Sequence, residues 1–465
     1  MVFSSALFLF AFLPVTYILC NIFRNNNIRN NILVVFSLLF YSFGRLDWLA
    51  LIVISSLCNY LAGISMKKFT SAKKLVLVAA LCVNLGVLAV FKYLNFFTAS
   101  LNMLPFVNIT PTNIALPIGI SFFTFQGMSY VIDVYRNPPE ASKSFAKVLL
   151  YISFFPQLVA GPIVKYSDIS HQIDQRQTTA DLTMSGIRRF VVGLSKKLFF
   201  ANTFGIIADA VYGMDASICD YRLAWLGVIG YVLQIYYDFS AYSDMAIGLG
   251  RIFGFSFIEN FNYPYVSKSI TEFWRRWHIS LSSWFRDYLY IPLGGNRKGS
   301  LRTVVNRFMV FFFTGMWHGA NWTFILWGLW HGLFLFAEDI ARKKNIRIPV
   351  VGHIYTMWVV AMGFMLFRAD TIADAWNMLR SMYGAVAVNS ESVLVLHNLF
   401  TPRMIVALVA GIIGVMPVAD FVRNKLPLNG KWWQIAGAAT VTVLFVLCII
   451  KLAASSFNPF IYTQF

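Results

Sequence analysis

The chain contains few charged residues for its length. Asp, Glu, Lys and Arg make up 12% of the 465 residues, and the mean hydropathy is +0.65. Soluble domains carry about 25% charged residues, so this composition excludes a soluble globular protein. It predicts instead an all-α polytopic membrane protein. The length rule for soluble domains does not apply to such a chain, and we expect a single membrane domain over residues 1–465.

Negative charge and cysteine are scarce as well. The 20 acidic residues are outnumbered by 38 Lys and Arg, which gives a net charge of +18. A basic excess can indicate nucleic-acid binding, but the cytoplasmic loops of a membrane protein account for it here, and we expect no nucleic-acid partner. The five cysteines are scattered and form no Cys-x-x-Cys pair, which argues against a disulfide framework and a zinc site. We therefore expect no metal.

Apolar segments that approach the length of a bilayer crossing recur along the whole chain. They predict about eleven to thirteen crossings, an approximate count because broken helices blur it. The segments lie near residues 3–22, 31–45, 47–66, 75–96, 114–132, 147–164, 223–248, 306–319, 322–340, 350–368, 401–419 and 433–453.

Positive charge predicts which loops lie in the cytoplasm. The first apolar run has no basic stretch before it and no small-residue cleavage motif, so we expect a retained helix with the N-terminus outside. On the same count the C-terminal tail, residues 455–465, also lies outside. Lys and Arg gather in the alternate loops near residues 24–29, 67–74, 136–147, 342–347 and 423–431.

Two regions differ from simple membrane spans. Residues 165–200 are mixed polar and basic, with apolar residues at helical spacing, which predicts an amphipathic helix at the cytoplasmic interface. Residues 251–302 are too polar to span, yet they are dense in Trp, Tyr and Arg. This composition predicts a re-entrant or interfacial helical hairpin, because irregular backbone at membrane depth must be buried in protein or line water.

The stretch from Phe308 to Ala337 has no charged residue but holds two of the six histidines, His318 and His331. An imidazole at membrane depth is costly unless it faces a cavity or a partner, so it marks a candidate site. The stretch is long enough for two helices broken at Gly319-Ala320-Asn321, which places His318 near the bend. A histidine in such a position, taken alone, is more often structural than catalytic.

Other polar motifs lie in or beside apolar segments. His278 follows the motif Thr271-Glu-Phe-Trp-Arg-Arg-Trp277, which indicates either an interfacial belt or a functional site. Asp238, in Tyr236-Tyr-Asp-Phe-Ser240, indicates either a structural hydrogen-bond network or catalysis, because a carboxylate at this depth needs a partner. Gln126 and Gln157 lie close to helix-interrupting Pro and Gly, where they either bind a ligand or pack helices.

As a set, these motifs resemble the membrane-bound O-acyltransferase family. Its members carry a histidine in a late apolar segment and a His, Asn or Asp about forty residues earlier in an aromatic-arginine motif, and here His278 precedes His318 by 40 residues. The resemblance runs over nearly the whole chain and is closest to the bacterial branch of alginate O-acetyltransferase membrane subunits. It is carried by Met1-Val-Phe-Ser-Ser-Ala-Leu-Phe-Leu-Phe10, Tyr237-Asp-Phe-Ser-Ala-Tyr-Ser-Asp244, Phe273-Trp-Arg-Arg-Trp-His278, Trp317-His-Gly319, Trp330-His-Gly332 and Asn458-Pro-Phe-Ile-Tyr462.

The resemblance implies transmembrane and re-entrant helices around a central tunnel, and acyl transfer from a thioester to a hydroxyl. It implies that His318 is the catalytic general base and that His278 either polarises the thioester carbonyl or holds the acceptor. The supporting and tunnel residues that we expect are His331, Asp238, Tyr237, Ser240, Gln126, Gln157, Trp274, Trp277 and Asn321.

The expected donor is acetyl-CoA or another acyl thioester in the cytoplasm, with no cofactor bound. The expected acceptor is a cell-envelope or exported polysaccharide, reached through an extracytoplasmic SGNH-hydrolase-like acetyltransferase at the bacterial cytoplasmic (inner) membrane. A set of basic residues is positioned to attract the phosphates of the donor, and the alternative is that the same charges anchor the loop to anionic lipid. These residues are Arg275, Arg276, Arg286, Arg297 and Lys298.

Three alternatives compete with this interpretation. Within the family, the alternative reaction is D-alanyl transfer to teichoic acid from an acyl carrier protein. A proton-coupled transporter or flippase would also use broken helices and intramembrane histidines, but it should show inverted repeats and acidic relays, and the sequence shows neither. A structural scaffold for polysaccharide export would keep its function when His318 is replaced.

Overall fold

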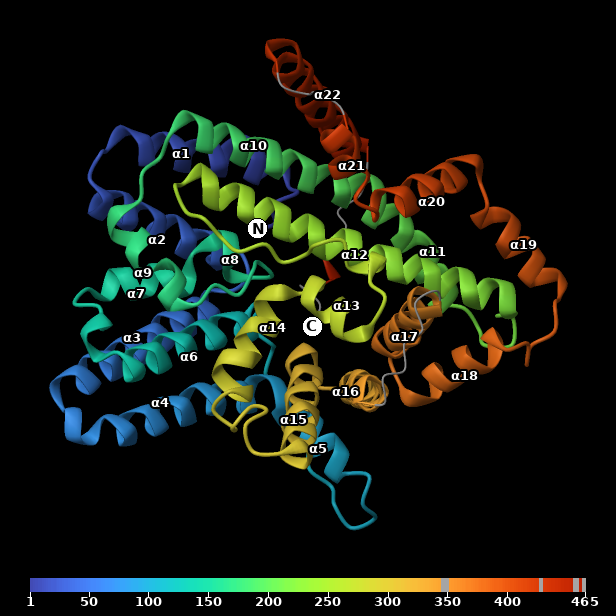
Figure 1. The fold of residues 1–465 in the computed structure, drawn as a ribbon, viewed down its shortest axis with the longest axis horizontal. Helices are drawn as coiled ribbons and strands as arrows, with labels where there is room; N and C mark the ends of the chain where they lie inside the picture. Colours follow the sequence, from blue (N-terminus) through green and yellow to red (C-terminus); the bar gives the residue numbers. More distant parts are fainter. Residues whose placement is uncertain (344–350, 426–429, 455–459, 462–465) are drawn as a thin grey trace. The chain divides into compact units, whose positions relative to one another are not determined.

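The computed structural model describes residues 1–343, 351–425, 430–454 and 460–461. These residues form helices joined by loops, and no strand occurs in this part of the chain (Figure 1). The prediction of an all-α chain is confirmed. Part of the basic loop near residues 342–347 and most of the tail at 455–465 lie outside the described residues.

Within the described ranges, six helices are long and apolar enough to cross a membrane, or seven if the bent pair α19 (Ser390–Leu399) and α20 (Pro402–Gly414) forms one span. The number is lower than the count of apolar segments because several segments fold as short or broken helices. The six are α3 (Leu46–Lys68), the run Thr70–Leu101, the run Ala180–Tyr212, α16 (Trp322–Lys343), α17 (Val351–Arg368) and α22 (Lys431–Ala454).

The apolar segment near residues 147–164 shows how a span is broken. Helix α7 (Phe145–Ser153) ends there, and the short helix α8 (Phe155–Leu158) begins with Pro156 in its first turn. Proline fits the start of a helix but not its interior, where it removes a backbone hydrogen bond and clashes with the preceding turn. The backbone therefore bends within a segment that hydropathy alone counts as one crossing.

The region at residues 165–200 contains more than one helical element, and its place at the cytoplasmic interface stays a prediction. Its first part is the short helix α9 (Tyr166–Gln175). Its second part belongs to a continuous helical run, formed by α10 (Ala180–Ser195), η5 (Lys196–Ala201) and α11 (Asn202–Tyr212), that is long enough to cross a membrane. One basic residue of this part, Lys197, is buried in an ion pair with Asp238.

The chain packs as two compact units, a division that no sequence feature predicted. The first unit contains Met1–Phe190 and Tyr242–Glu259, and the second contains Val191–Ala241 and Asn260–Ile461. Helices α10 and α12 (Tyr221–Ile252) each contribute residues to both units. The motifs around His278 and His318 belong to the second unit.

In the first unit, α3 and α4 (Lys73–Leu88) pack against α6 (Ile120–Arg136), and α2 (Asn26–Ser42) packs against α7 (Figure 1). Asn59 of α3 and Asn84 of α4 exchange hydrogen bonds of 2.8 and 3.2 Å in the interior. Each amide supplies the partner that the other needs, which is how polar groups are buried at a helix contact. Close ring contacts fill the surrounding core among Phe3, Phe8, Phe12, Phe40 and Phe155.

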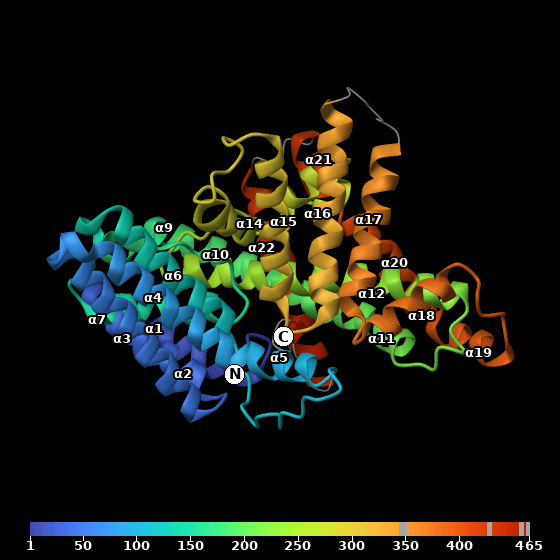
Figure 2. The ribbon, with the colours of Figure 1, turned by 90° about the horizontal axis from the view of Figure 1, so that it is seen from below.

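In the second unit, α15 (Ser300–His318), α16 and α17 lie side by side, with α16 between the other two (Figure 2). Helices α15 and α16 approach closely because glycine lies at their contact. A Cβ atom on Gly315 would clash with the backbone carbonyl of Phe324, and one on Gly328 would clash with that of Phe311. This close approach fixes the end of α15, where His318 lies, against α16.

Short helices complete this arrangement. Helix α13 (Ile270–Arg276) packs against α16 and α17, and α14 (Ile279–Phe285) follows it after a sharp turn. The turn between α13 and α14 carries His278. The rest of the unit includes α18 (Ile372–Met382), α19, α20, α21 (Val418–Lys425) and α22.

Candidate active site

His278 lies at the junction of α13 and α14 in a strained backbone conformation. Its φ is +45°, a left-handed value that among the described non-glycine residues it shares with Tyr263. Such a conformation costs about 1–3 kcal/mol and persists where the surrounding structure enforces it. The imidazole is completely buried. Residues 251–302, expected to form a hairpin, contain short helices on either side of this turn.

One buried amide holds His278 and the start of α14. The Oδ1 atom of Asn260 lies 3.2 Å from His278 Nδ1 and accepts hydrogen bonds from the Ser280 N–H (3.2 Å) and the Ser280 hydroxyl (2.9 Å). An amide oxygen only accepts, so the neutral His278 ring carries its hydrogen on Nδ1 and its lone pair on Nε2. In that state Nε2 accepts a hydrogen bond and donates none.

His318 is the last residue of α15, and the chain continues extended at Gly319, so the predicted break is present. The His318 ring lies 6.3 Å from the His278 ring, centroid to centroid. It packs edge-to-face with Trp327 of α16 at 4.9 Å and with Phe367 of α17 at 5.1 Å. Two histidines that stand 40 residues apart in sequence therefore meet in one buried, aromatic site.

His331 lies one helical turn beyond Trp327 and reaches the site through aromatic rings. Its ring is 5.2 Å from Trp327 and 5.2 Å from Trp274 of α13. The Trp274 and Trp327 rings are 5.7 Å apart, and all three side chains are buried. Trp327 thus contacts both His318 and His331, and Trp274 contacts Trp327.

The Asp238 motif forms a structural network. The Asp238 carboxylate lies 2.6 Å from Lys197 Nζ and accepts a hydrogen bond of 2.7 Å from the Ile461 N–H. The Tyr237 hydroxyl donates to the Gly411 carbonyl at 2.7 Å, and the buried Ser240 hydroxyl has no hydrogen-bond partner among the described residues. The neighbouring Phe239 joins this motif to the site, because its ring lies 4.6 Å from that of His278.

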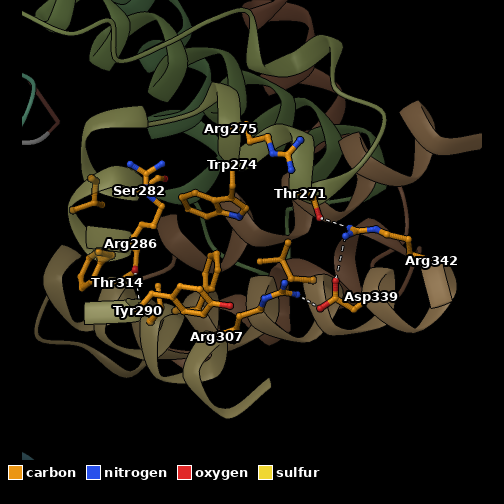
Figure 3. A pocket seen from close by; sticks show the side chains of 15 residues that line it. Thr271, Trp274, Arg275, Ser282, Arg286, Tyr290, Arg307, Thr314, Asp339 and Arg342 are labelled. Carbon is orange, nitrogen blue, oxygen red and sulfur yellow. Dashed lines mark hydrogen bonds and ion pairs between the residues drawn. The ribbon is translucent and has the colours of Figure 1, made fainter. Parts of the chain in front are cut away.

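An open cavity of about 310 Å³ lies beside α13, and four arginines line it. Figure 3 shows Arg275, Arg286, Arg307 and Arg342 around the cavity, with the Trp274 ring in its wall. Arg307 forms an ion pair with Asp339, and Arg342 lies 3.7 Å from the same carboxylate. Asp339 is the one acidic residue in this lining, and Arg286 pairs with Asp287 at 2.7 Å outside it. Four arginines therefore face two carboxylates, so the cavity keeps a net positive charge that suits an anionic ligand.

The other predicted donor-binding residues do not line the cavity. Arg276 pairs with Glu272 at 2.9 Å, and Arg297 and Lys298 are exposed. Asn321 holds the chain at the start of α16. Its side chain donates to the Asp370 carbonyl at 2.7 Å and accepts from the Thr323 N–H at 3.2 Å.

The remaining predicted side chains pack in the interior of their units. Trp277 stacks on Phe273 at 5.5 Å and contacts Phe364. Gln126 and Gln157 are fully buried in the first unit. The Gln157 amide donates to the Tyr151 carbonyl at 2.6 Å, whereas the Gln126 amide has no partner within the described part of the chain.

Several contributors escaped the sequence analysis. Asn260 stands 18 residues before His278 in a polar stretch with no motif of its own. Glu338 caps the first turn of α13, because its carboxylate accepts from the N–H groups of Ile270 and Thr271 and from the Thr271 hydroxyl. The one sequence feature that could have pointed to Glu338 is its position directly after a long uncharged stretch.

The fold and the site define a class of membrane enzyme. Residues 120–373 match the model of the MBOAT, membrane-bound O-acyltransferase family, and this range covers more than half of the chain. The chain belongs to this family and is a multi-pass membrane O-acyltransferase. This membership sets aside the transporter and scaffold alternatives.

Proteins similar to this chain indicate the branch of the family to which it belongs. The chain is 39% identical to a probable alginate O-acetylase, AlgI, of Pseudomonas putida over the full length of both proteins. It is 43% identical to the probable AlgI of Pseudomonas aeruginosa over 82% of this chain and 75% of that protein. A peptidoglycan O-acetyltransferase of Helicobacter pylori is 35% identical over 84% of this chain and 81% of its own. The chain therefore lies in the AlgI-like branch, as its motifs indicated.

Proposed function

We propose that this enzyme transfers an acetyl group from cytoplasmic acetyl-CoA to hydroxyls of a cell-envelope or exported polysaccharide. The observation that carries the proposal is the buried pair of His278 and His318, whose rings lie 6.3 Å apart. The names of similar proteins, which refer to alginate and peptidoglycan O-acetylation, support acetyl as the group and a glycan as the acceptor.

His318 acts as the general base in this proposal. Transfer from a thioester to a hydroxyl forms a C–O bond and breaks a C–S bond, and the hydroxyl proton must leave as its oxygen attacks. A neutral imidazole takes this proton and returns it to the departing sulfur, which leaves as a thiol. The aromatic rings of Trp327 and Phe367 around His318 exclude water that would otherwise hydrolyse the thioester.

His278 holds the acceptor hydroxyl. The sequence left two roles open for it, polarising the thioester carbonyl and holding the acceptor. Because Nδ1 faces the Asn260 oxygen, the neutral ring presents a lone pair at Nε2, which accepts from a hydroxyl and donates nothing to a carbonyl. This tautomer favours the second role.

The donor binds in the arginine-lined cavity. In this proposal Arg275 and Arg286 attract the CoA phosphates, and Arg307 and Arg342 add to the positive field of the cavity. Trp274 connects this cavity to the aromatic rings around His318, since it lines the cavity and its ring lies 5.7 Å from that of Trp327. The acyl group follows this path while the CoA phosphates stay in the cavity.

The transfer is completed on the outer side by an extracytoplasmic SGNH-hydrolase-like acetyltransferase. A central tunnel carries the acetyl group between the two sides of a bacterial inner membrane, with both chain ends outside. The family resemblance and the alternation of basic loops support this arrangement.

The ester content of the cell surface tests the proposal. Cells carrying wild type, His318→Ala or His278→Ala are compared at matched membrane expression, with the exposed His397→Ala as the control. Acetate released by mild base from purified envelope glycans should fall by at least about 100-fold in His318→Ala and stay at wild-type level in His397→Ala, since general-base catalysis contributes about 10²–10⁴-fold.

Two other results would overturn parts of the proposal. Unchanged acetate in His318→Ala would remove the general-base role from this residue. Release of D-alanine in place of acetate from wild-type cells would show that the transferred group belongs to the teichoic-acid reaction. The glycan fraction that carries the ester in wild-type cells identifies the acceptor.

A further inference from the structure

The proposed reaction needs a hydrogen-bond donor that the two histidines do not supply. When a hydroxyl attacks a thioester, the carbonyl oxygen becomes an oxyanion, and enzymes place donors where that charge develops. Neutral His278 has its hydrogen on Nδ1, directed to Asn260. His318 must be unprotonated at the nitrogen that takes the hydroxyl proton. A further N–H close to His318 is therefore required.

Among the buried indole N–H groups near the histidines, those of two tryptophans on α13 and α16 have no acceptor among the described residues. They are the Nε1 atoms of Trp274 and Trp327. Two tryptophans of the same unit do have acceptors: Trp330 Nε1 donates to the Val359 carbonyl at 2.9 Å, and Trp225 Nε1 donates to the Met382 carbonyl at 3.1 Å. An unsatisfied buried donor costs about 1–3 kcal/mol, so two of them in one cluster call for an acceptor that arrives with a ligand.

Trp327 is the better placed of the two for chemistry at His318. Its ring is 4.9 Å from the His318 ring, edge to face, and it is 1% exposed. Trp274 contacts Trp327 and lines the arginine-rich cavity, so an acyl chain that passes Trp274 next meets Trp327.

The Trp327 ring is also held in one orientation. It is enclosed by His318, by His331 at 5.2 Å and by Phe367 at 5.2 Å. On the α17 side, the backbone of Gly363 lies close to the ring. A Cβ atom at this position would be 3.5 Å from Trp327 Cδ1, the carbon bonded to Nε1. An N–H fixed in a dry, packed site stabilises charge without reorganising during the reaction, which is the property of an effective oxyanion donor.

We propose that the indole N–H of Trp327 donates a hydrogen bond to the carbonyl oxygen of the acyl group and stabilises the oxyanion beside His318. This role rests on the proposed function. The acceptor oxygen attacks the carbonyl carbon, its proton passes to His318, and the C=O electron pair moves to the oxygen that Trp327 contacts. The carbonyl then re-forms, the C–S bond breaks, and the proton moves from His318 to sulfur to release a thiol and an ester.

Replacement of one N–H tests this role. Membranes from cells that express the protein together with its extracytoplasmic partner are assayed, at matched amounts of the protein, with acetyl-CoA and an oligosaccharide prepared from the glycan fraction that wild-type cells esterify. Trp327→Phe keeps an aromatic ring but removes the donor, and kcat should fall about 10²–10³-fold while KM for acetyl-CoA changes less than about threefold. Benzothienylalanine at position 327, which keeps the two-ring shape without an N–H, should lower kcat equally.

The matched control is Trp330→Phe, one turn along the same helix, whose N–H is already paired with the Val359 carbonyl. It should retain wild-type kcat. A Trp327→Phe enzyme with near-wild-type kcat, or full activity with benzothienylalanine beside an inactive Phe variant, would show that packing and not the N–H matters and would overturn the proposal. These results are distinct from failure of the proposed function, in which wild type itself transfers no acetyl group.

Discussion

At the scale of the residue, Asn260 explains how the strained His278 is maintained. A left-handed φ at a non-glycine residue is unfavourable, and three donors on the Asn260 oxygen compensate for it while fixing the ring tautomer. The same oxygen caps the start of α14 through the Ser280 N–H. Asn260 is therefore a positioning residue, because it acts on the reaction through His278.

The cavity yields a prediction for single arginines. Arg275→Gln should raise KM for acetyl-CoA about tenfold with little change in kcat, because a hydrogen bond to a charged group contributes about 1.5–3 kcal/mol to binding. Arg275 lines the cavity and has no ion pair within the described residues. Initial rates measured over a range of acetyl-CoA concentrations give both constants.

Arg297→Gln is the matched control, because Arg297 has the same charge and lies in the same basic region but does not line the cavity. Its KM should stay within about twofold of wild type, as expected for an exposed charge outside a site. Equal increases in KM for both variants would mean that the region acts through its overall charge, and the cavity would lose its role as donor site.

At the scale of the element, α16 orients α13 through one carboxylate. Glu338 of α16 accepts from the first N–H groups of α13, which have no partner within their own helix, and its charge also suits the positive end of the helix dipole. Because Trp274 and His278 follow on α13 and the turn after it, Glu338 sets their position relative to His331 on α16.

Removal of this cap should lower the stability of the protein. Glu338→Ala should lower the free energy of unfolding by about 1–3 kcal/mol, because buried N–H groups lose their acceptor. Glu338→Gln, which keeps an oxygen acceptor, should lie between Ala and wild type. Thermal unfolding of the purified protein, followed by tryptophan fluorescence, measures both. Glu391→Ala, an exposed residue in the first turn of α19, controls for loss of a surface carboxylate, and an equal loss there would refute the capping role.

Elements also show what the sequence could and could not predict. The all-α fold and the break after His318 follow from hydropathy and from Gly319, which are local features. Arg307 and Arg342 join Arg275 only because α15 and α16 pack beside α13, and no local pattern encodes that contact. No sequence motif singled out Trp327, because a missing acceptor is a property of the packed site and not of the sequence.

At the scale of the whole molecule, Lys197 and Asp238 connect distant parts of the chain. Lys197 lies in the run Ala180–Tyr212, Asp238 lies in α12, and the Ile461 N–H donates to the second carboxylate oxygen. Phe460 packs its ring 4.5 Å from the Lys197 ammonium. The sequence did not single out Lys197, because its partner stands 41 residues away, beyond any local pattern.

Breaking this pair from one side should be more harmful than removing both charges. Lys197→Met leaves the Asp238 carboxylate buried without its cation and should cost about 3–5 kcal/mol of stability. The double variant Lys197→Met/Asp238→Leu removes both charges and should be considerably more stable than the single variant, since a buried ion pair is often no better than apolar packing. Thermal unfolding in nanodiscs compares the two variants with wild type.

The neighbouring Lys196→Met is the control for loss of a lysine in the same turn, because Lys196 is half-buried whereas Lys197 is buried. If the double variant is as unstable as Lys197→Met, the pair itself contributes net stability rather than only avoiding an unpaired charge. Part of the stability lost in the double variant comes from the Ile461 N–H, because the leucine at position 238 leaves this group without its acceptor. Ile461→Pro on the wild-type background removes the same hydrogen bond and measures that part separately.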